Sequence, residues 1–158
     1  MSEVDAAQFR HLCGRFATGV VVVTAVRADG SPAGMTANSF TSVSLEPPLV
    51  SVNVDSAADF HGVVIAARGF VINILDSSQE ALSRRFAAAS AHQFDGVGYR
   101  RTEWGGIVLD GVIAAIDCKT ERLIDVGDHT IVVGRVAGGE THEGRPLLYF
   151  RGGYHTLS

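Results

Sequence analysis

Apolar residues repeat with helical spacing in three parts of the chain, and each part predicts a helix. In residues 5–17 the apolar positions follow the i, i+3, i+4, i+7 pattern, and Asp5 precedes them as the expected N-cap. Residues 55–68 show the same spacing and stop before Gly69, a residue type common just after helix ends. Ser77-Ser78-Gln79-Glu80 has the pattern of a capping box, so a third helix is expected to run from there to about residue 89.

Short β-branched runs alternate with turn residues over the rest of the chain, and they predict a mainly β protein. Val20–Val26, the turn Asp29-Gly30-Ser31 and a strand beginning at Gly34 have the pattern of a β-hairpin. Further strands are expected at 49–54, 70–75, 112–123, 130–136 and 147–150, and the two long ones suit a barrel wall better than a βαβ unit. The long loop 90–106 favours a lid or an interface. We expect one domain over residues 1–158.

Composition and charge narrow the functional classes. Of the 158 residues, 46% are apolar and 19% are charged, which is typical of a globular protein. The net charge is −4 without a basic cluster, so nucleic acid is not expected as a partner. The apolar runs are too short to span a membrane, and the acidic start, Met1 to Asp5, does not resemble a signal peptide. A cytoplasmic protein without membrane association is expected.

Cysteines and histidines give no sign of a metal or redox centre. Cys13 and Cys118 form no CxxC pair and are expected to be buried, reduced thiols. The six histidines lack the spacing of metal ligands, so no metal site is expected. The chain has neither a Walker A motif nor a Gly-x-Gly-x-x-Gly motif, so any nucleotide must bind in another way.

The stretch from Gly34 to Pro48 is uncharged until Glu46 but rich in small polar residues. If it forms one strand, hydroxyls and amides point to both faces, where an ordinary half-buried strand would alternate apolar and polar residues. Buried polar groups need hydrogen-bond partners, and a ligand rich in donors and acceptors would supply them. An edge strand with a wet face is the simpler alternative.

The order of motifs along the chain resembles the flavin reductase-like family, whose members are FMN-binding split barrels. Gly34-Met-Thr-Ala-Asn-Ser-Phe-Thr-Ser-Val-Ser44, followed by Pro47-Pro48-Leu49, resembles the family signature. Phe16 to Thr24, Phe70 to Leu75, Arg85-Phe86-Ala87, Gly127-Asp128-His129 and Arg145 to Phe150 match other family segments in the expected order. The resemblance implies a mainly β split barrel of Greek-key type with peripheral helices, assembled as a homodimer.

The resemblance also assigns roles to residues. Thr36, Ala37, Asn38 and Ser39 would meet the isoalloxazine ring, and Ser42, Val43 and Ser44 would flank the ribityl chain. His129 would serve the nicotinamide as the catalytic residue, with Tyr154 beside it, although a histidine after Gly-Asp can also be a plain turn residue. The remaining cofactor-binding residues would be Ser56, Asn73, Arg85 and Phe86.

Two positions in the sequence leave alternatives open. Asn73 lies in an apolar strand, where its amide could meet either a backbone carbonyl across the barrel or the flavin. Asp59 departs from the family pattern, because an inward carboxylate would repel the flavin phosphate. Arg84 or Arg85 could supply the missing positive charge, or both could be solvated on the helix surface.

The function implied by the resemblance is NAD(P)H-dependent reduction of FMN or FAD, with the reduced flavin passed to a partner monooxygenase. The donor would be NADH or NADPH, and the protein would place the ring while the cofactor supplies the hydride chemistry. Two rivals remain open at this point: an oxidoreductase that retains FMN and acts on an organic substrate, and a non-catalytic flavin or haem carrier built on the same barrel.

Overall fold

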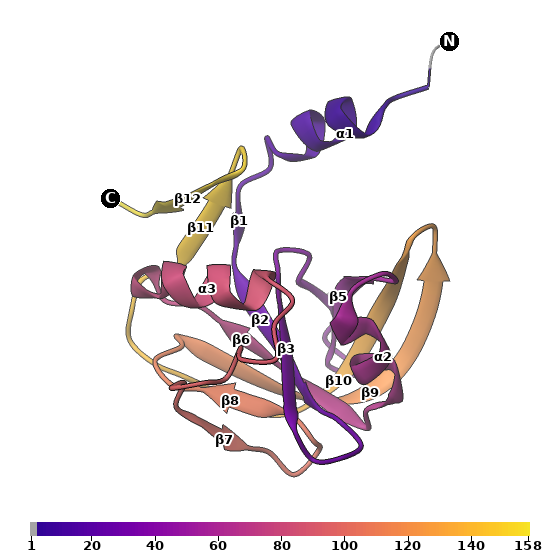
Figure 1. The fold of residues 1–158 in the computed structure, drawn as a ribbon, viewed down its shortest axis with the longest axis vertical. Helices are drawn as coiled ribbons and strands as arrows, with labels where there is room; N and C mark the ends of the chain where they lie inside the picture. The colour runs from indigo at the N-terminus through magenta and orange to yellow at the C-terminus, as the bar shows by residue number, and fades with distance from the viewer. Residues whose placement is uncertain (1–2) are drawn as a thin grey trace.

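The computed structural model describes residues 3–158, so Met1 and Ser2 of the acidic N-terminal segment lie outside the described part. Strands dominate the architecture and confirm the mainly β prediction (Figure 1). The helices are α1 (Ala6–Cys13), α2 (Asp59–Ala66), the short 3-10 helix η1 (Ser77–Gln79) and α3 (Glu80–Ala87).

One antiparallel sheet of seven strands forms the body of the molecule. Its order is β3 (Pro32–Ala37), β2 (Val21–Val26), β6 (Gly69–Ile74), β9 (Ala114–Val126), β10 (His129–Thr141), β5 (Leu49–Asp55) and β4 (Thr41–Ser44). A second sheet joins β1 (Thr18–Gly19), β11 (Leu147–Phe150) and β12 (Gly153–Thr156). A third pairs β7 (Tyr99–Arg101) with β8 (Ile107–Leu109). The loop predicted over 90–106 therefore contains a strand of its own.

The middle of the large sheet is buried on both faces. Val21 and Val23 of β2 pack into one apolar cluster with β5 and α2, while Val20 and Val22 pack into another with α3 and β8. This is why β2 and β6 read as continuous apolar runs rather than alternating ones. Phe86 of α3 belongs to the second cluster and packs against β3 at Gly34, where a Cβ would lie 2.9 Å from its ring.

Helix α1 projects from the body of the protein (Figure 1). Asp5 caps it as predicted, accepting a hydrogen bond from the backbone N–H of Gln8, but the helix ends at Cys13 instead of continuing to residue 17. None of its residues is buried against the rest of the described chain, and Phe9, Leu12 and Phe16 are 60, 58 and 78% exposed. Cys13 is exposed as well, so the expectation of a buried thiol is wrong there and correct only for Cys118. The apolar spacing thus predicts the helix correctly, but its apolar face lacks a partner within residues 3–158.

The capping box before α3 begins one residue earlier than expected. The carboxylate of Asp76 accepts a hydrogen bond from the backbone N–H of Ser78, and the side chain of Gln79 accepts one from the backbone N–H of Asp76. A carboxylate is a stronger acceptor than the Ser77 hydroxyl, which explains the shift.

The polar stretch from Gly34 to Ser44 is two strands, not one. β3 and β4 form the opposite edges of the seven-stranded sheet, and the chain crosses from one edge to the other through Asn38, Ser39 and Phe40. The expected alternation of faces along a single strand is therefore wrong beyond Ala37. Residues that seemed to be neighbours on one strand lie on different sides of the barrel opening.

Asn73 lies in the core and makes its hydrogen bonds within the protein. It is 0% exposed; its Nδ2 lies 3.1 Å from the carbonyl oxygen of Val22 and 3.0 Å from that of Ile107, and its Oδ1 accepts from the N–H of Leu109 at 2.9 Å. The amide thus binds β8 to the sheet. This corrects the prediction that Asn73 contacts flavin and favours the backbone alternative.

We predict that Asn73→Leu lowers the free energy of unfolding by about 1–3 kcal/mol, because the variant leaves the buried Leu109 N–H without its acceptor. Urea unfolding measures this loss. Asn53→Leu removes an amide from an exposed position on β5 and is the matched control. An equal effect of the two substitutions would contradict a structural role for Asn73.

Candidate functional site

Three adjoining hollows follow β3 and form what we call the β3 groove. The His129 hollow and the Tyr154 hollow share Thr36, Ala37 and Asn38, so they meet at the end of β3. The Ala57 hollow shares Met35 with the first and Ala87 with the second. Within residues 3–158, β3 pairs with β2 alone, so its other backbone edge presents N–H and C=O groups without a strand partner.

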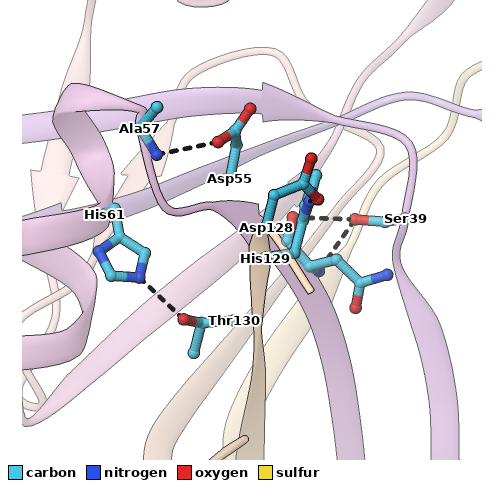
Figure 2. Close-up of polar contacts among 8 residues, drawn as sticks. Ser39, Asp55, Ala57, His61, Asp128, His129 and Thr130 are labelled. Atoms are coloured by element: carbon cyan, nitrogen blue, oxygen red, sulfur yellow. Dashed lines mark hydrogen bonds and ion pairs between the residues drawn. The ribbon is translucent and has the colours of Figure 1, made fainter. Parts of the chain in front are cut away.

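The His129 hollow lies between the end of β3 and the strands β5 and β10. Its volume of about 480 Å³ is within the usual range for small-molecule sites. Its walls are Phe9, Met35, Thr36, Ala37, Asn38, Ser39, Asn53, Asp55, Asp128 and His129. The hydroxyl of Ser39 bridges the gap, accepting from the backbone N–H of Asn53 at 3.0 Å and donating to its carbonyl oxygen at 3.3 Å (Figure 2).

His129 begins β10 and is held by the residue before it. Its Nδ1 lies 2.7 Å from the Oδ1 of Asp128, and this hydrogen bond lowers the pKa of the Asp128 carboxyl from its ordinary value. Because a carboxylate can only accept, Nδ1 carries the hydrogen and Nε2 is left for another contact. The turn before it uses Gly127 with φ of +57°, a conformation that favours glycine. The histidine side chain is 43% exposed, so a ligand can reach it.

The Tyr154 hollow is built on a buried serine. Ser83 of α3 is 0% exposed; its hydroxyl lies 2.7 Å from the Tyr154 hydroxyl, and its carbonyl oxygen accepts from the Thr36 hydroxyl at 2.6 Å. One residue of α3 therefore fixes both β3 and the β12 hairpin. The guanidinium of Arg84 lies 4.8 Å from the centre of the Tyr154 ring, close enough for a cation–π contact.

The Ala57 hollow lies at the start of α2. Its lining includes the backbone of Ala57, Ala58 and Asp59, and the helix starts without a side-chain cap from the described residues. Arg27 is the one basic side chain among the described residues that line it, and its Nη1 donates to the carbonyl oxygen of Pro32 at 2.6 Å. Asp59 also faces this hollow, so a carboxylate and a guanidinium share it.

The structure brings together seven of the residues proposed from the sequence. They are Thr36, Ala37, Asn38, Ser39, Phe86, His129 and Tyr154, all of which line the β3 groove. Ser56 is exposed on the turn between Asp55 and Ala57, which border different hollows, and its own side chain lines neither.

Other proposed residues lie elsewhere. Ser42, Val43 and Ser44 are on β4, at the opposite edge of the sheet, because the chain crosses over before them. Arg85 is exposed and donates to the carbonyl oxygen of Asp95, so it does not supply the expected charge in the groove. Phe86 does border the Ala57 hollow of the groove, where it is 1% exposed and packs edge-to-face on Phe94, so its contact with the cofactor stays a prediction.

Sequence reasoning missed Arg27 and Ser83. Arg27 follows the strand β2 and carries no motif, so only its proximity to α2 and Ala87 in the fold reveals it. Ser83 had a usable signal, since it is a small polar residue on the same helix face as Phe86, three residues away. A polar residue on a buried helix face needs a partner, and here that partner is Tyr154.

The sequence of this chain is similar to those of known flavin reductases. The flavin reductase like domain matches residues 13–158. A flavin reductase of Pseudomonas putida is 39% identical over 97% of this chain and 91% of its own length. The reductase component of the flavin-dependent trigonelline monooxygenase of Acinetobacter baylyi is 40% identical over 99% of this chain, which spans only 52% of that protein.

A solved structure agrees with the sequence matches. The NADH:FAD oxidoreductase of Streptomyces globisporus, in complex with NAD and FAD fragments, superposes with a TM-score of 0.92 at 37% identity, covering 100% of this chain and 98% of its own. The split-barrel fold expected from the sequence is thereby confirmed. No helix within residues 3–158 is long and apolar enough to cross a membrane. On the domain match and these identities, the chain belongs to the flavin reductase-like family.

Proposed function

We propose that this protein reduces FMN or FAD with NADH or NADPH in the β3 groove and supplies the reduced flavin to a partner monooxygenase. The observation that carries the proposal is that an uncharged polar floor and a reachable histidine meet in one groove. The P. putida relative is named a flavin reductase, and the A. baylyi relative is named a reductase component of a monooxygenase. A cytoplasmic location belongs to the same proposal, because the reaction consumes a nicotinamide nucleotide.

The floor of the groove fits the polar edge of a flavin ring. Thr36, Ala37 and Asn38 offer neutral side chains and an unpaired backbone edge, so they provide donors and acceptors without adding charge beside the ring. Flavin, when bound, supplies the hydride acceptor. The protein supplies the position of the two rings, and close alignment of reacting groups is a large part of catalysis in such reactions.

His129 is proposed to orient the nicotinamide. With Nδ1 bound to Asp128, the neutral ring offers the Nε2 lone pair to an amide N–H, and the protonated ring offers an N–H to a carbonyl. Tyr154, fixed by Ser83, would form the wall of the same groove on the other side of Asn38. Both contacts use groups that are already held before a ligand arrives.

The Ala57 hollow is the proposed phosphate end. The Ala57 and Ala58 N–H groups already donate to Asp55, so the backbone N–H groups left for an anion are those of Asp59 and Phe60. Together with the guanidinium of Arg27 they suit an anion, whereas the Asp59 carboxylate opposes one. The fit is therefore partial at this end and better along the ring-binding floor. We infer that the flavin is held mainly by its ring and exchanges with solution, which suits a protein that hands reduced flavin to a partner.

A homodimer is part of the proposal. The exposed apolar face of α1, together with Val43 and Leu45, which are 53 and 93% exposed, is typical of a surface covered by a second chain. Phe9 of α1 also lines the His129 hollow, so the helix that would join the two copies reaches the site.

We predict that His129→Ala slows flavin reduction about tenfold, the effect of losing one hydrogen bond of about 1.4 kcal/mol in the transition state. Stopped-flow reduction at saturating flavin, over a range of NAD(P)H concentrations, separates nicotinamide binding from the limiting rate. His92→Ala is the control, because His92 forms a similar pair with Asp95 outside the groove. Wild-type rates at every NAD(P)H concentration would remove His129 from the site.

We predict that Asp59→Lys tightens FMN binding roughly two- to fivefold, which corresponds to the ~0.4–1 kcal/mol of an exposed ion pair. Riboflavin, which lacks the phosphate, should bind with unchanged affinity. Flavin titration measures both. Glu143→Lys makes the same charge change at an exposed site outside the groove and controls for net charge. Weaker FMN binding with unaltered riboflavin binding would show that the phosphate lies elsewhere.

We predict that Leu12→Glu shifts the protein from dimer to monomer, because it places a charge in the exposed apolar face of α1. Sedimentation velocity across a concentration series measures the shift. Ala7→Glu adds the same charge to the opposite face of the helix and should leave the dimer intact. If the wild-type protein sediments as a monomer, the homodimer proposal fails.

A further inference from the structure

We propose that His61, Thr130 and Asp125 form a positioning relay for His129, in which a chain of hydrogen bonds fixes the start of β10 against α2 and β9. The inference rests on the proposed role of His129 and adds residues that touch no ligand themselves. None of the three was singled out by the sequence motifs. Their importance comes from where Thr130 lies.

Thr130 follows His129 directly and faces the other way. Adjacent residues of a strand point to opposite faces of a sheet, so the side chain of Thr130 points toward α2 while that of His129 borders the groove. Thr130 is 1% exposed, whereas its neighbour is accessible. Figure 2 shows the contact between His61 and Thr130, with Asp128 and His129 at the start of the same strand. A constraint on Thr130 is therefore a constraint on the backbone that carries His129.

The hydrogen positions in the relay follow from the partners. The Thr130 hydroxyl donates to the Oδ1 of Asp125 at 2.8 Å, since a carboxylate can only accept. The hydroxyl has no second hydrogen, so the His61 Nε2, 2.8 Å away, must be the donor in their contact. His61 thus carries its hydrogen on Nε2, opposite to His129, which carries it on Nδ1. The same reasoning shows that Thr130 is not an activated nucleophile.

The start of β10, next to the β9–β10 turn, is held from two sides. On one side, β5 pairs with β10 from the register of Asp55 with His129, and the backbone N–H of Ser56 donates to the carbonyl oxygen of Asp128 at 2.9 Å. On the other side, His61 reaches in from α2, two residues after Asp59. Because the start of α2 lines the Ala57 hollow, the relay also ties the proposed phosphate end of the groove to the strand that carries His129.

The test compares Thr130→Val with Thr130→Ser. Valine keeps the shape but removes the hydroxyl, and a misplaced catalytic group should slow the limiting rate of flavin reduction roughly three- to tenfold. The flavin dissociation constant should not change, because the floor of the groove lies on β3. Serine keeps the hydroxyl and should restore the wild-type rate. His61→Ala, a change in a helix side chain that is only half-buried, should slow reduction in the same way and serves if the valine variant does not fold.

Two readouts on the ligand-free protein are independent of activity. Nitrogen-15 NMR of the imidazoles at alkaline pH should show His61 with its hydrogen on Nε2 and His129 with its hydrogen on Nδ1. Backbone hydrogen exchange at His129 and Thr130 should accelerate in Thr130→Val and not in Thr130→Ser. A His61 ring protonated on Nδ1 alone, or unchanged exchange in the valine variant, would overturn the relay.

A double-mutant cycle separates this inference from the proposed function. If the relay acts through His129, Thr130→Val should cause no further loss of rate in a His129→Ala background. A full additional loss there would overturn the relay as a device for His129. If His129→Ala alone leaves the rate unchanged, the proposed role of His129 fails, whereas the NMR and exchange measurements still decide whether the relay exists. If His129→Ala slows reduction but folded Thr130→Val and His61→Ala do not, the relay is refuted.

Discussion

The groove exists because the two edges of the seven-stranded sheet do not pair with each other. The sheet curves until β3 and the β5–β4 edge approach, and at that point the chain crosses between them through three residues. The Ser39 hydroxyl satisfies the backbone of Asn53 across the gap, so one side chain replaces the strand-to-strand hydrogen bonds that closure would have made. Unpaired edge backbone is ordinarily a liability in a β protein. Here it lines a ligand-sized hollow.

Asn73 and Asn38 differ in whether the fold gives their side-chain amides hydrogen-bond partners. The Asn73 amide of β6 hydrogen-bonds to backbone groups of Val22, Ile107 and Leu109, and so holds β2, β6 and β8 together. Asn38 is at the crossover and borders both the His129 and the Tyr154 hollow. The sequence shows the same residue type after Thr36-Ala37 in the small polar stretch and inside the apolar run from Val71 to Leu75. It cannot show which amide has partners, because those partners come from segments far away in the chain.

Local signals predicted local features well, and long-range features less well. Spacing and turn chemistry indicated the helices, the β2–β3 hairpin and the long β9–β10 pair. β7 and β8 are three residues each, too short for a periodic pattern to mark them. The crossover after Ala37 was hidden because Ser and Thr continue on both sides of it. The family resemblance pointed to His129 and Thr36–Ser39. For the cation near the groove the sequence offered Arg84 or Arg85 and not Arg27, because the choice depends on how α3 packs against β3.

The length of the crossover sets a limit on what the barrel can hold. Ala37 and Thr41 end and begin the two edge strands, and four extended residue steps cover at most roughly 13–14 Å. At the crossover, the two edges can therefore be no farther apart than that without breaking a strand, whatever side chains line the groove. Deleting a residue from 38–40 would draw the edges together, and inserting one would let them separate. In related barrels, a change in the length of this segment would change the size of ligand that fits, while the rest of the sheet could remain as it is.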